Sequence, residues 1–137
     1  MTTLFIDTGP LVGRVLPRDQ HYHASRKGWG TLEDLNTKLF SSEHVLDEAV
    51  TLLARQAGSN YAVRWAREHL ASQELVWLET TREDLQEALR WLDKFADQKL
   101  SFTDCLSFSL MRRQGIQTVF GFDQHFELAG FELWPQL

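Results

Sequence analysis

Four acidic positions along this chain could together bind a metal ion. Asp7, Asp104 and Asp123 border apolar segments, and a fourth acid lies in "VLDEAVTLL", where Asp47 and Glu48 are neighbours. Hard divalent cations prefer oxygen ligands, and magnesium takes only a few carboxylates because it keeps several of its waters. Three or four converging acids would therefore suit one or two such ions, which activate water and stabilise a leaving oxygen.

Short strands alternating with helices would have to position these acids. Apolar runs predict strands at 3–7 and from residues 38, 75 and 118, the run from 38 being the weakest. Helical periodicity predicts helices over about 21–35, 43–57, 60–72, 82–96 and 102–114. This alternation is typical of an α/β fold with a mainly parallel central sheet of about four to five strands and helices on both faces.

Asp7 and Asp123 each stand at the carboxyl end of a predicted strand. In parallel α/β sheets these ends share one edge, and the ligand crevice lies beyond it. Taken separately, each residue also fits a structural role, because the Asp in "DTGP" can start a turn and the Asp in "GFDQHF" can cap a short helix. A ligand site is favoured because both residues are expected at the same edge of the sheet.

Asp104 lies in "SFTDCLSFSLMRR", which is otherwise small or apolar up to Met111 and therefore predicts a buried helix. Ser101 and Asp104 match a capping box, as Thr81 and Asp84 do at the preceding helix. The helix after Asp84 has a charged face, whereas a carboxylate at a buried helix start is costly unless it is paired or binds a metal. From this pattern alone, both the cap and the metal ligand stay open.

The helix predicted over 43–57 carries a wide apolar stripe, and Asp47 and Glu48 border that stripe on opposite sides. Periodicity does not choose between them. Either residue could also be a solvated charge that flanks the stripe.

The remaining residues that could do chemistry are few. His21 and His23 lack the further Cys or His neighbours of a structural zinc site. His125 is interpreted as a packing or capping residue. The single cysteine, Cys105, lies in an apolar run, where a cysteine usually packs as a small hydrophobic side chain.

At 137 residues the chain fits one domain, which we expect to span 1–137. The net charge of −5 argues against non-specific nucleic-acid binding, which needs a cationic surface. Specific binding stays possible, because acids that hold cations would themselves make the charge negative. The N-terminus has neither a basic start nor an unbroken apolar run, so we expect a cytoplasmic protein without a membrane segment.

In their order and spacing, "LFIDTGPLV", "VLDEAVTLL", "LSFTDCLSFSLMRRQGI" and "TVFGFDQHFELAGF" resemble the PIN domain, and within it the VapC-type toxins of bacterial and archaeal toxin–antitoxin pairs. The match covers nearly the whole chain. The resemblance implies a single PIN-like domain, Mg²⁺ or Mn²⁺ in an acidic cleft, and endoribonuclease activity. It also favours Glu48 over Asp47, because Glu48 stands at the position that the family uses.

The resemblance implies a role for each acid. We expect Asp7, Asp104 and Asp123 to ligate metal, and Glu48 to ligate it or to orient the attacking water, so that all four are catalytic. The products would carry 5′-phosphate and 3′-hydroxyl ends.

Other residues would support the metal ligands or the substrate. Thr8 and Thr103 could hold hydrogen bonds to the carboxylates. RNA would need basic groups, for which the candidates are Arg14, Arg18, Arg112 and Arg113. The arginines at 112 and 113 are equally explained by the favourable charge at a helix C-terminus. The expected partners are the RNA substrate, a small cognate antitoxin and a second copy in a homodimer.

Two other functions stay compatible with the sequence. One is a non-catalytic PIN-like protein whose acids are caps and whose Trp-rich surfaces bind a partner protein. The other is a PIN-type RNA-processing nuclease outside a toxin system. Loss of metal binding with retained partner binding would favour the non-catalytic protein over a nuclease. A gene for a small antitoxin immediately upstream would favour a toxin over an RNA-processing nuclease.

Overall fold

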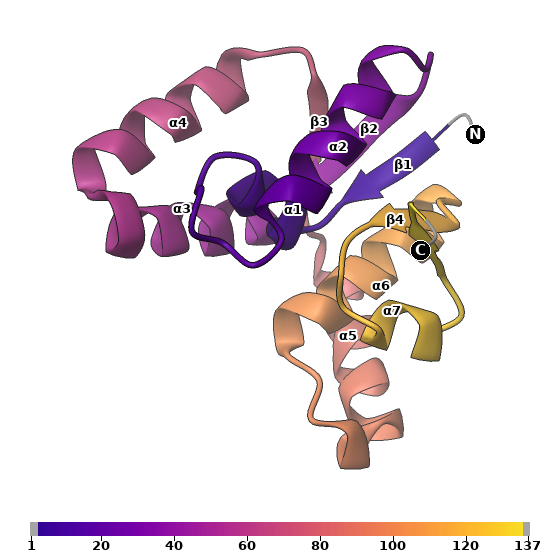
Figure 1. The fold of residues 1–137 in the computed structure, drawn as a ribbon. Helices are drawn as coiled ribbons and strands as arrows, with labels where there is room; N and C mark the ends of the chain where they lie inside the picture. Colours follow the sequence, from indigo (N-terminus) through magenta and orange to yellow (C-terminus); the bar gives the residue numbers. More distant parts are fainter. Residues whose placement is uncertain (1–2, 136–137) are drawn as a thin grey trace.

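Five short strands form one parallel sheet through the centre of the protein, in a computed structural model that describes residues 3–135 (Figure 1). The strands are β1 (Thr3–Ile6), β2 (Lys38–Ser42), β3 (Leu75–Leu78), β4 (Thr118–Phe120) and β5 (Glu132–Trp134). Their order is β3-β2-β1-β4-β5, and every neighbouring pair is parallel. The predicted fold class is therefore confirmed.

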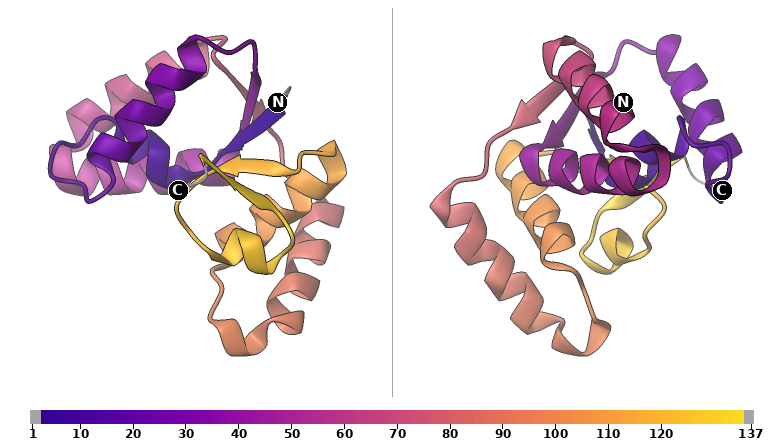
Figure 2. Two further views of the ribbon diagram at one scale, coloured as in Figure 1. Left: turned by 45° about the vertical axis from the view of Figure 1, so that its right-hand side comes forward. Right: turned by 90° about the vertical axis from the view of Figure 1, so that its left-hand side faces the viewer.

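Seven α-helices and one 3₁₀ helix connect the strands within residues 3–135. They are α1 (Thr8–Gly13), α2 (Tyr22–Glu33), α3 (Glu43–Ala57), α4 (Ser59–Ala71), α5 (Arg82–Lys94), η1 (Ala96–Gln98), α6 (Phe102–Gln114) and α7 (His125–Leu128). Helices α1 to α4 cover one face of the sheet and α5 to α7 the other (Figures 1 and 2), as right-handed crossovers require for this strand order. None of the helices in the described part of the chain has the length and apolar character needed to cross a membrane.

The strand order reverses between β1 and β4. The chain moves outward from β1 through β2 to β3, and then returns to the other side of β1 for β4 and β5. In open parallel sheets, the crevice beyond the carboxyl ends of the two strands at such a reversal is where ligands bind. Asp7 directly follows β1, and Asp123 follows β4.

Helix α1 is absent from the sequence prediction, which placed a turn at Gly9-Pro10. The segment forms a helix because Pro10 lies in its first turn, where a backbone amide has no helical partner to lose. Gly9 allows a close approach here, since a Cβ at this position would lie 3.1 Å from the ring of Phe122, a contact that the ring would have to shift slightly to accept. The short strand β5 was likewise not located by any sequence pattern.

Helix α6 is buried along its length, as its composition predicted. Every residue from Cys105 to Met111 is buried. The Phe108 ring contacts the rings of Trp91, Phe126 and Phe131 at centroid separations of 5.1 to 5.8 Å. This packing fixes α6 against α5 and α7, and so holds its first turn, which carries Asp104, close to the loop that follows β4.

Asp84 links α5 to α6, and its removal should destabilise the protein. Its carboxylate accepts the Thr81 amide at 2.9 Å, completing a capping box, and accepts two bonds from the Arg113 guanidinium at 3.0 Å. Burial of Asp84 acts to raise its pKa, but these hydrogen bonds outweigh burial and hold the pKa below its usual value.

We expect Asp84→Ala to lower the free energy of unfolding by about 2 kcal/mol near neutral pH, through loss of the cap and of the partly buried ion pair. Because the pKa in the folded state is depressed, this stabilisation is present above the unfolded pKa and is lost as the pH falls below it. Urea denaturation measures the effect. Glu83→Ala, one residue earlier and exposed, is the control, and equal losses in the two variants would contradict the assignment.

Candidate active site

Asp7 is held at the edge of the sheet between β1 and β4. Its amide donates to the Phe120 carbonyl at 3.0 Å, which ties it to the end of β4. Asp7 stands at the N-cap of α1, yet its side chain makes no capping hydrogen bond. The side chain is buried, with 8% exposure. The turn or cap role considered from the sequence therefore does not account for this carboxylate.

Asp104 forms only half of the capping box that the sequence suggested. The Ser101 hydroxyl accepts the Asp104 amide at 3.0 Å, but the Ser101 amide donates no bond to the Asp104 carboxylate, in contrast to the complete box of Thr81 and Asp84. The Asp104 carboxylate instead lies beside Asp123 and His125. Each of these three residues offers one ligand atom, and the three atoms lie within 4.8 Å of one another.

Asp123 is placed by the loop that follows β4. One of its oxygens accepts the His125 amide at 2.9 Å, which is the cap-like role that the sequence allowed for it. The same oxygen lies 3.0 Å from His125 Nδ1, and His125 Nδ1 lies 3.9 Å from Asp104 Oδ2. His125 thus lies between the two carboxylates.

The structure separates Glu48 from Asp47. Glu48 is half-buried on α3, and its charge raises the pKa of both Asp7 and Asp104. Asp47 is exposed and is not among the charges that act on either carboxyl. Helix α3 begins at the Ser42 cap, whose hydroxyl accepts the Val45 amide at 3.1 Å, while the Ser41 hydroxyl donates to the Ile6 carbonyl at 2.7 Å. These bonds set α3, and with it Glu48, against the end of β1.

The four carboxylates repel one another strongly in the absence of a cation. Burial, followed by the charge of Asp104, raises the pKa of Asp7 to about 8, and the charges of Glu48 and Asp123 add to the rise. Burial and the neighbouring Asp123 raise the pKa of Asp104 to about 7, against the lowering effect of the Ser101 hydroxyl. No Lys or Arg among residues 3–135 forms an ion pair with any of the four acids. The site therefore favours a proton or a cation between the carboxylates.

The residues present fit a divalent ion. All four candidate ligands offer hard oxygen atoms, which is the donor set that Mg²⁺ and Mn²⁺ prefer. One buried polar atom next to Asp7, Thr8 Oγ1, has no hydrogen-bond partner in the described part of the protein. Such an atom suits a contact to the water shell that magnesium usually retains.

The predicted supporting threonines do not contact the acids through their hydroxyl groups. Thr8 Oγ1 is buried without a partner, although the Thr8 backbone helps to stabilise ionised Asp7 and so lowers its pKa. Thr103 lines an open groove next to Glu48. Within residues 3–135, neither side chain is hydrogen-bonded to a carboxylate.

Two of the four arginines proposed for RNA binding have other partners. Arg14 donates to Glu74 at 2.9 Å and lies 3.7 Å from the centre of the Trp29 ring. Arg113 is paired with Asp84. Arg112 is exposed and lies over the Trp91 ring at 5.2 Å, and Arg18 is exposed in the loop between α1 and α2. Of the four arginines proposed as contacts to RNA, Arg14 and Arg113 are therefore engaged within the protein.

His125 is the site residue that sequence reasoning missed. Its demotion to a packing or capping residue rested on its neighbour Phe126, which is indeed buried. The available signal was its position two residues after Asp123, where it begins the short helix α7 that follows β4. Its contact with Asp104, which lies 21 residues earlier in the chain, depends on the tertiary fold.

Comparisons with known proteins agree with this geometry. A sequence model of the PIN domain matches residues 4–132. The chain is 33% identical, over 135 residues, to the 23S rRNA-specific endonuclease VapC20 of Mycobacterium tuberculosis, covering 97% of this chain and 99% of the relative.

Among solved structures, two illustrate the shared fold. The crystal structure of M. tuberculosis VapC20, described as a sarcin–ricin loop cleaving toxin, superposes with a TM-score of 0.84 at 30% identity, covering 93% of this chain and 95% of that chain. The structure of VapBC2 from Rickettsia felis, bound to a DNA fragment from their promoter, superposes with a TM-score of 0.68 at 15% identity, covering 96% and 97% of the two chains. At that identity the second likeness concerns the fold alone.

Proposed function

The chain belongs to the PIN-domain family, and from that premise we propose that it is a metal-dependent endoribonuclease and the toxin of a VapBC-type toxin–antitoxin pair. The observation that carries the proposal is the convergence of Asp7, Glu48, Asp104 and Asp123 at one sheet edge, where no Lys or Arg of residues 3–135 forms an ion pair with them. These side chains come from four separate segments of the fold, and each of the other three raises the pKa of Asp7.

We assign the metal-binding role to Asp7, Asp104 and Asp123, with Mg²⁺ or Mn²⁺ as the ion. When bound, such an ion lowers the pKa of water and stabilises charge on the phosphate that is cleaved. Glu48 has no hydrogen-bond or ion-pair partner within residues 3–135, so its carboxylate is free to accept a hydrogen bond from the attacking water and to take its proton. His125 lies beside Asp123 and Asp104, where it can hold their orientation.

The relative named above suggests which RNA to test first. VapC20 is described as specific for 23S rRNA and as cleaving the sarcin–ricin loop. At 33% identity over almost the whole of both chains, we propose ribosomal RNA as the substrate class for this protein too. A small antitoxin that covers the cleft is the expected partner, together with a second copy in a homodimer.

The non-catalytic alternative depended on tryptophans exposed for a partner. Trp29, Trp65 and Trp91 are buried, and Trp77 and Trp134 are half-buried. None of the five tryptophans is available as an exposed surface residue, which weakens that alternative.

The test is cleavage of intact ribosomes and of total RNA by purified protein free of antitoxin, with Mg²⁺, Mn²⁺ or EDTA. We expect discrete cuts in ribosomal RNA with either metal and none with EDTA, with 5′-phosphate ends on the products. Absence of cleavage with both metals, combined with absence of metal binding by calorimetry, would remove the nuclease proposal.

A further inference from the structure

A groove of about 390 Å³ runs along α3 and includes Glu48 of the acidic site. It is lined by His44, Asp47, Glu48, Thr51, Leu52 and Arg55 of α3 and by Thr103 at the start of α6. The α3 residues recur at spacings of three and four, so they form one continuous face of the helix. Glu48 and Thr103 belong both to this groove and to the surroundings of the active site.

Arg55 provides positive charge in this groove. It is exposed, and within the described part of the chain it forms no ion pair, in contrast to Arg14 and Arg113. Arg55 follows Glu48 by seven positions, which places it two helical turns, or about 10 Å, farther along α3. Its long side chain can therefore reach a group close to, but not at, the reacting centre.

The remaining polar groups of the groove include both signs. Thr51, Thr103 and His44 can donate hydrogen bonds to oxygen atoms, whereas the exposed carboxylate of Asp47 repels anions. An anionic ligand that reaches the acids through this groove would thus be attracted by Arg55 and opposed by Asp47. Removing the charge of Arg55 should therefore weaken the binding of such a ligand, and removing the charge of Asp47 should strengthen it.

We propose that this groove is a subsite for the RNA backbone, in which Arg55 binds a phosphate next to the bond that is cut. The assignment rests on the proposed ribonuclease function, and it answers a problem that the function raises. An acidic chain with a net charge of −5 must hold a polyanion close to four carboxylates. A local guanidinium is suited to this task, because it binds phosphate oxygens through paired hydrogen bonds.

The test measures RNA binding separately from cleavage. Because phosphate contacts do not depend on base sequence, the probe is a fluorescein-labelled single-stranded RNA of mixed sequence, titrated with protein in EDTA at several salt concentrations. Each phosphate contact to a single strand contributes about 0.7 to the slope of log K against log salt, or about fivefold in affinity at 0.1 M salt. We therefore expect Arg55→Gln to weaken binding about fivefold and to reduce the slope by about 0.7.

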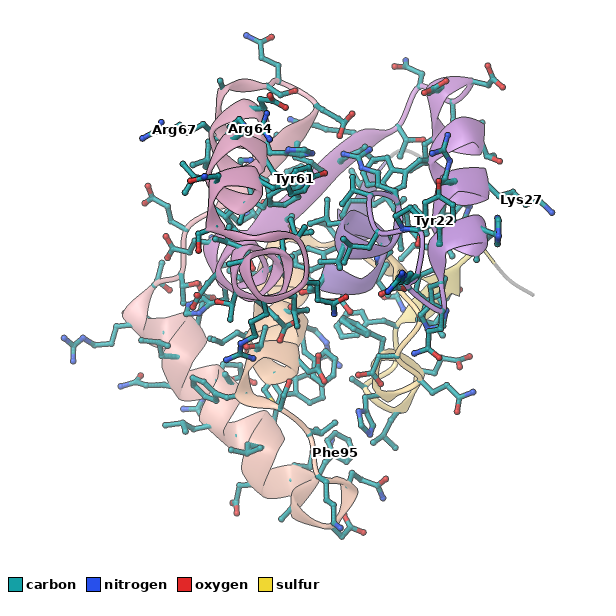
Figure 3. The ribbon with its side chains drawn as sticks, turned by 60° about the vertical axis from the view of Figure 1, so that its left-hand side comes forward. Tyr22, Lys27, Tyr61, Arg64, Arg67 and Phe95 are labelled. Atoms are coloured by element: carbon teal, nitrogen blue, oxygen red, sulfur yellow. The ribbon has the colours of Figure 1, made fainter. Side chains whose placement is uncertain are left out.

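Two further variants sharpen the test. Arg67→Gln removes the same charge from α4, where the side chain points outward, away from α2, and does not line the groove (Figure 3). It should leave the affinity and the salt slope unchanged. Asp47→Asn should tighten binding about twofold by removing the repelling charge. In the cleavage assay, Arg55→Gln should raise KM and leave kcat nearly constant, since it removes binding shared by substrate and transition state.

The outcomes separate this inference from the proposed function. If the parent binds and cleaves RNA but Arg55→Gln behaves like Arg67→Gln, the subsite is wrong and the nuclease stands. Equal losses in both arginine variants would show general charge attraction and would also overturn the subsite. If the parent neither binds nor cleaves RNA, both proposals fail together. Selective loss in Arg55→Gln, with partial rescue in Arg55→Lys, supports the subsite.

Discussion

Asp104→Asn is expected to lower RNA cleavage about a thousandfold or more while leaving the protein folded. The amide is nearly the same size as the carboxyl, but it removes a charged metal ligand and hence several kcal/mol of transition-state stabilisation, at a factor of ten for each 1.4 kcal/mol. The cap of α6 survives, because the Ser101 hydroxyl accepts the backbone amide of residue 104 and not its side chain. Folding should therefore be retained.

The measurement is the initial rate of ribosomal RNA cleavage at saturating Mg²⁺ or Mn²⁺, with circular dichroism as the check on folding. Asp7→Asn should show a loss of similar size, since Asp7 shares the site. Asp97→Asn is the matched control. Asp97 is exposed in η1, which follows α5 directly after Phe95 (Figure 3). The Asp97→Asn protein should cleave RNA at the parental rate. A folded Asp104→Asn protein that keeps more than about a tenth of the parental rate would rule out the metal-ligand role.

Without metal, stability should fall as the pH rises from about 4 to about 8, and divalent metal should reverse this fall. The pKa values of Asp7 and Asp104 are about 8 and about 7 in the folded protein, against 3.8 ordinarily. Between these values the folded state keeps protons that the unfolded state has lost. Stability is therefore full below the unfolded pKa and is lost as the pH rises through the folded pKa, with a slope of about 1.4 kcal/mol per pH unit for each retained proton.

Metal binding requires the ionised carboxylates, so it releases these protons and becomes tighter as the pH rises. Urea denaturation from pH 5 to 8.5, with EDTA or with Mn²⁺, would measure both effects. In EDTA, Asp7→Asn should flatten the pH dependence and be more stable than the parent at pH 8, because a buried charge and its repulsion are removed. In Mn²⁺ the parent should be more stable than Asp7→Asn, because only the parent keeps the full set of metal ligands. If the stability of the parent in EDTA were constant between pH 5 and 8.5, this result would contradict the raised pKa values of Asp7 and Asp104.

The predictions for Asp84→Ala and for Asp7→Asn give opposite signs for the change in stability of the metal-free protein. Replacing a residue that only supports the fold should destabilise the protein, as expected for Asp84. Replacing a residue that serves metal binding should stabilise the metal-free protein and still abolish RNA cleavage, as expected for Asp7. Comparing Asp84→Ala with Asp7→Asn in one denaturation series therefore distinguishes a structural carboxylate from a functional one.

By itself, the sequence determined the alternation of strands and helices, the buried character of α6 and the meeting of Asp7 and Asp123 at one sheet edge. These features follow from local periodicity and from the rule that the strands of a parallel sheet share one carboxyl edge. The choice of Glu48 over Asp47 came from the family resemblance, because helical spacing places both beside the apolar stripe. The three-residue strand β5 is too short for a periodic signal, and Pro10 obscured helix α1.

Only the tertiary structure decided which charges are paired. Asp84 and Asp104 begin their helices with the same capping pattern, yet Asp84 meets Arg113, 29 residues away, while Asp104 meets Asp123 and His125. Arg14 is likewise paired with Glu74, 60 residues away. Arg55, in a groove beside the acids, has no ion-pair partner among residues 3–135. The physical reason is that hydrophobic periodicity acts over one or two turns, whereas the partner of a charge is set by how the crossovers bring distant segments together.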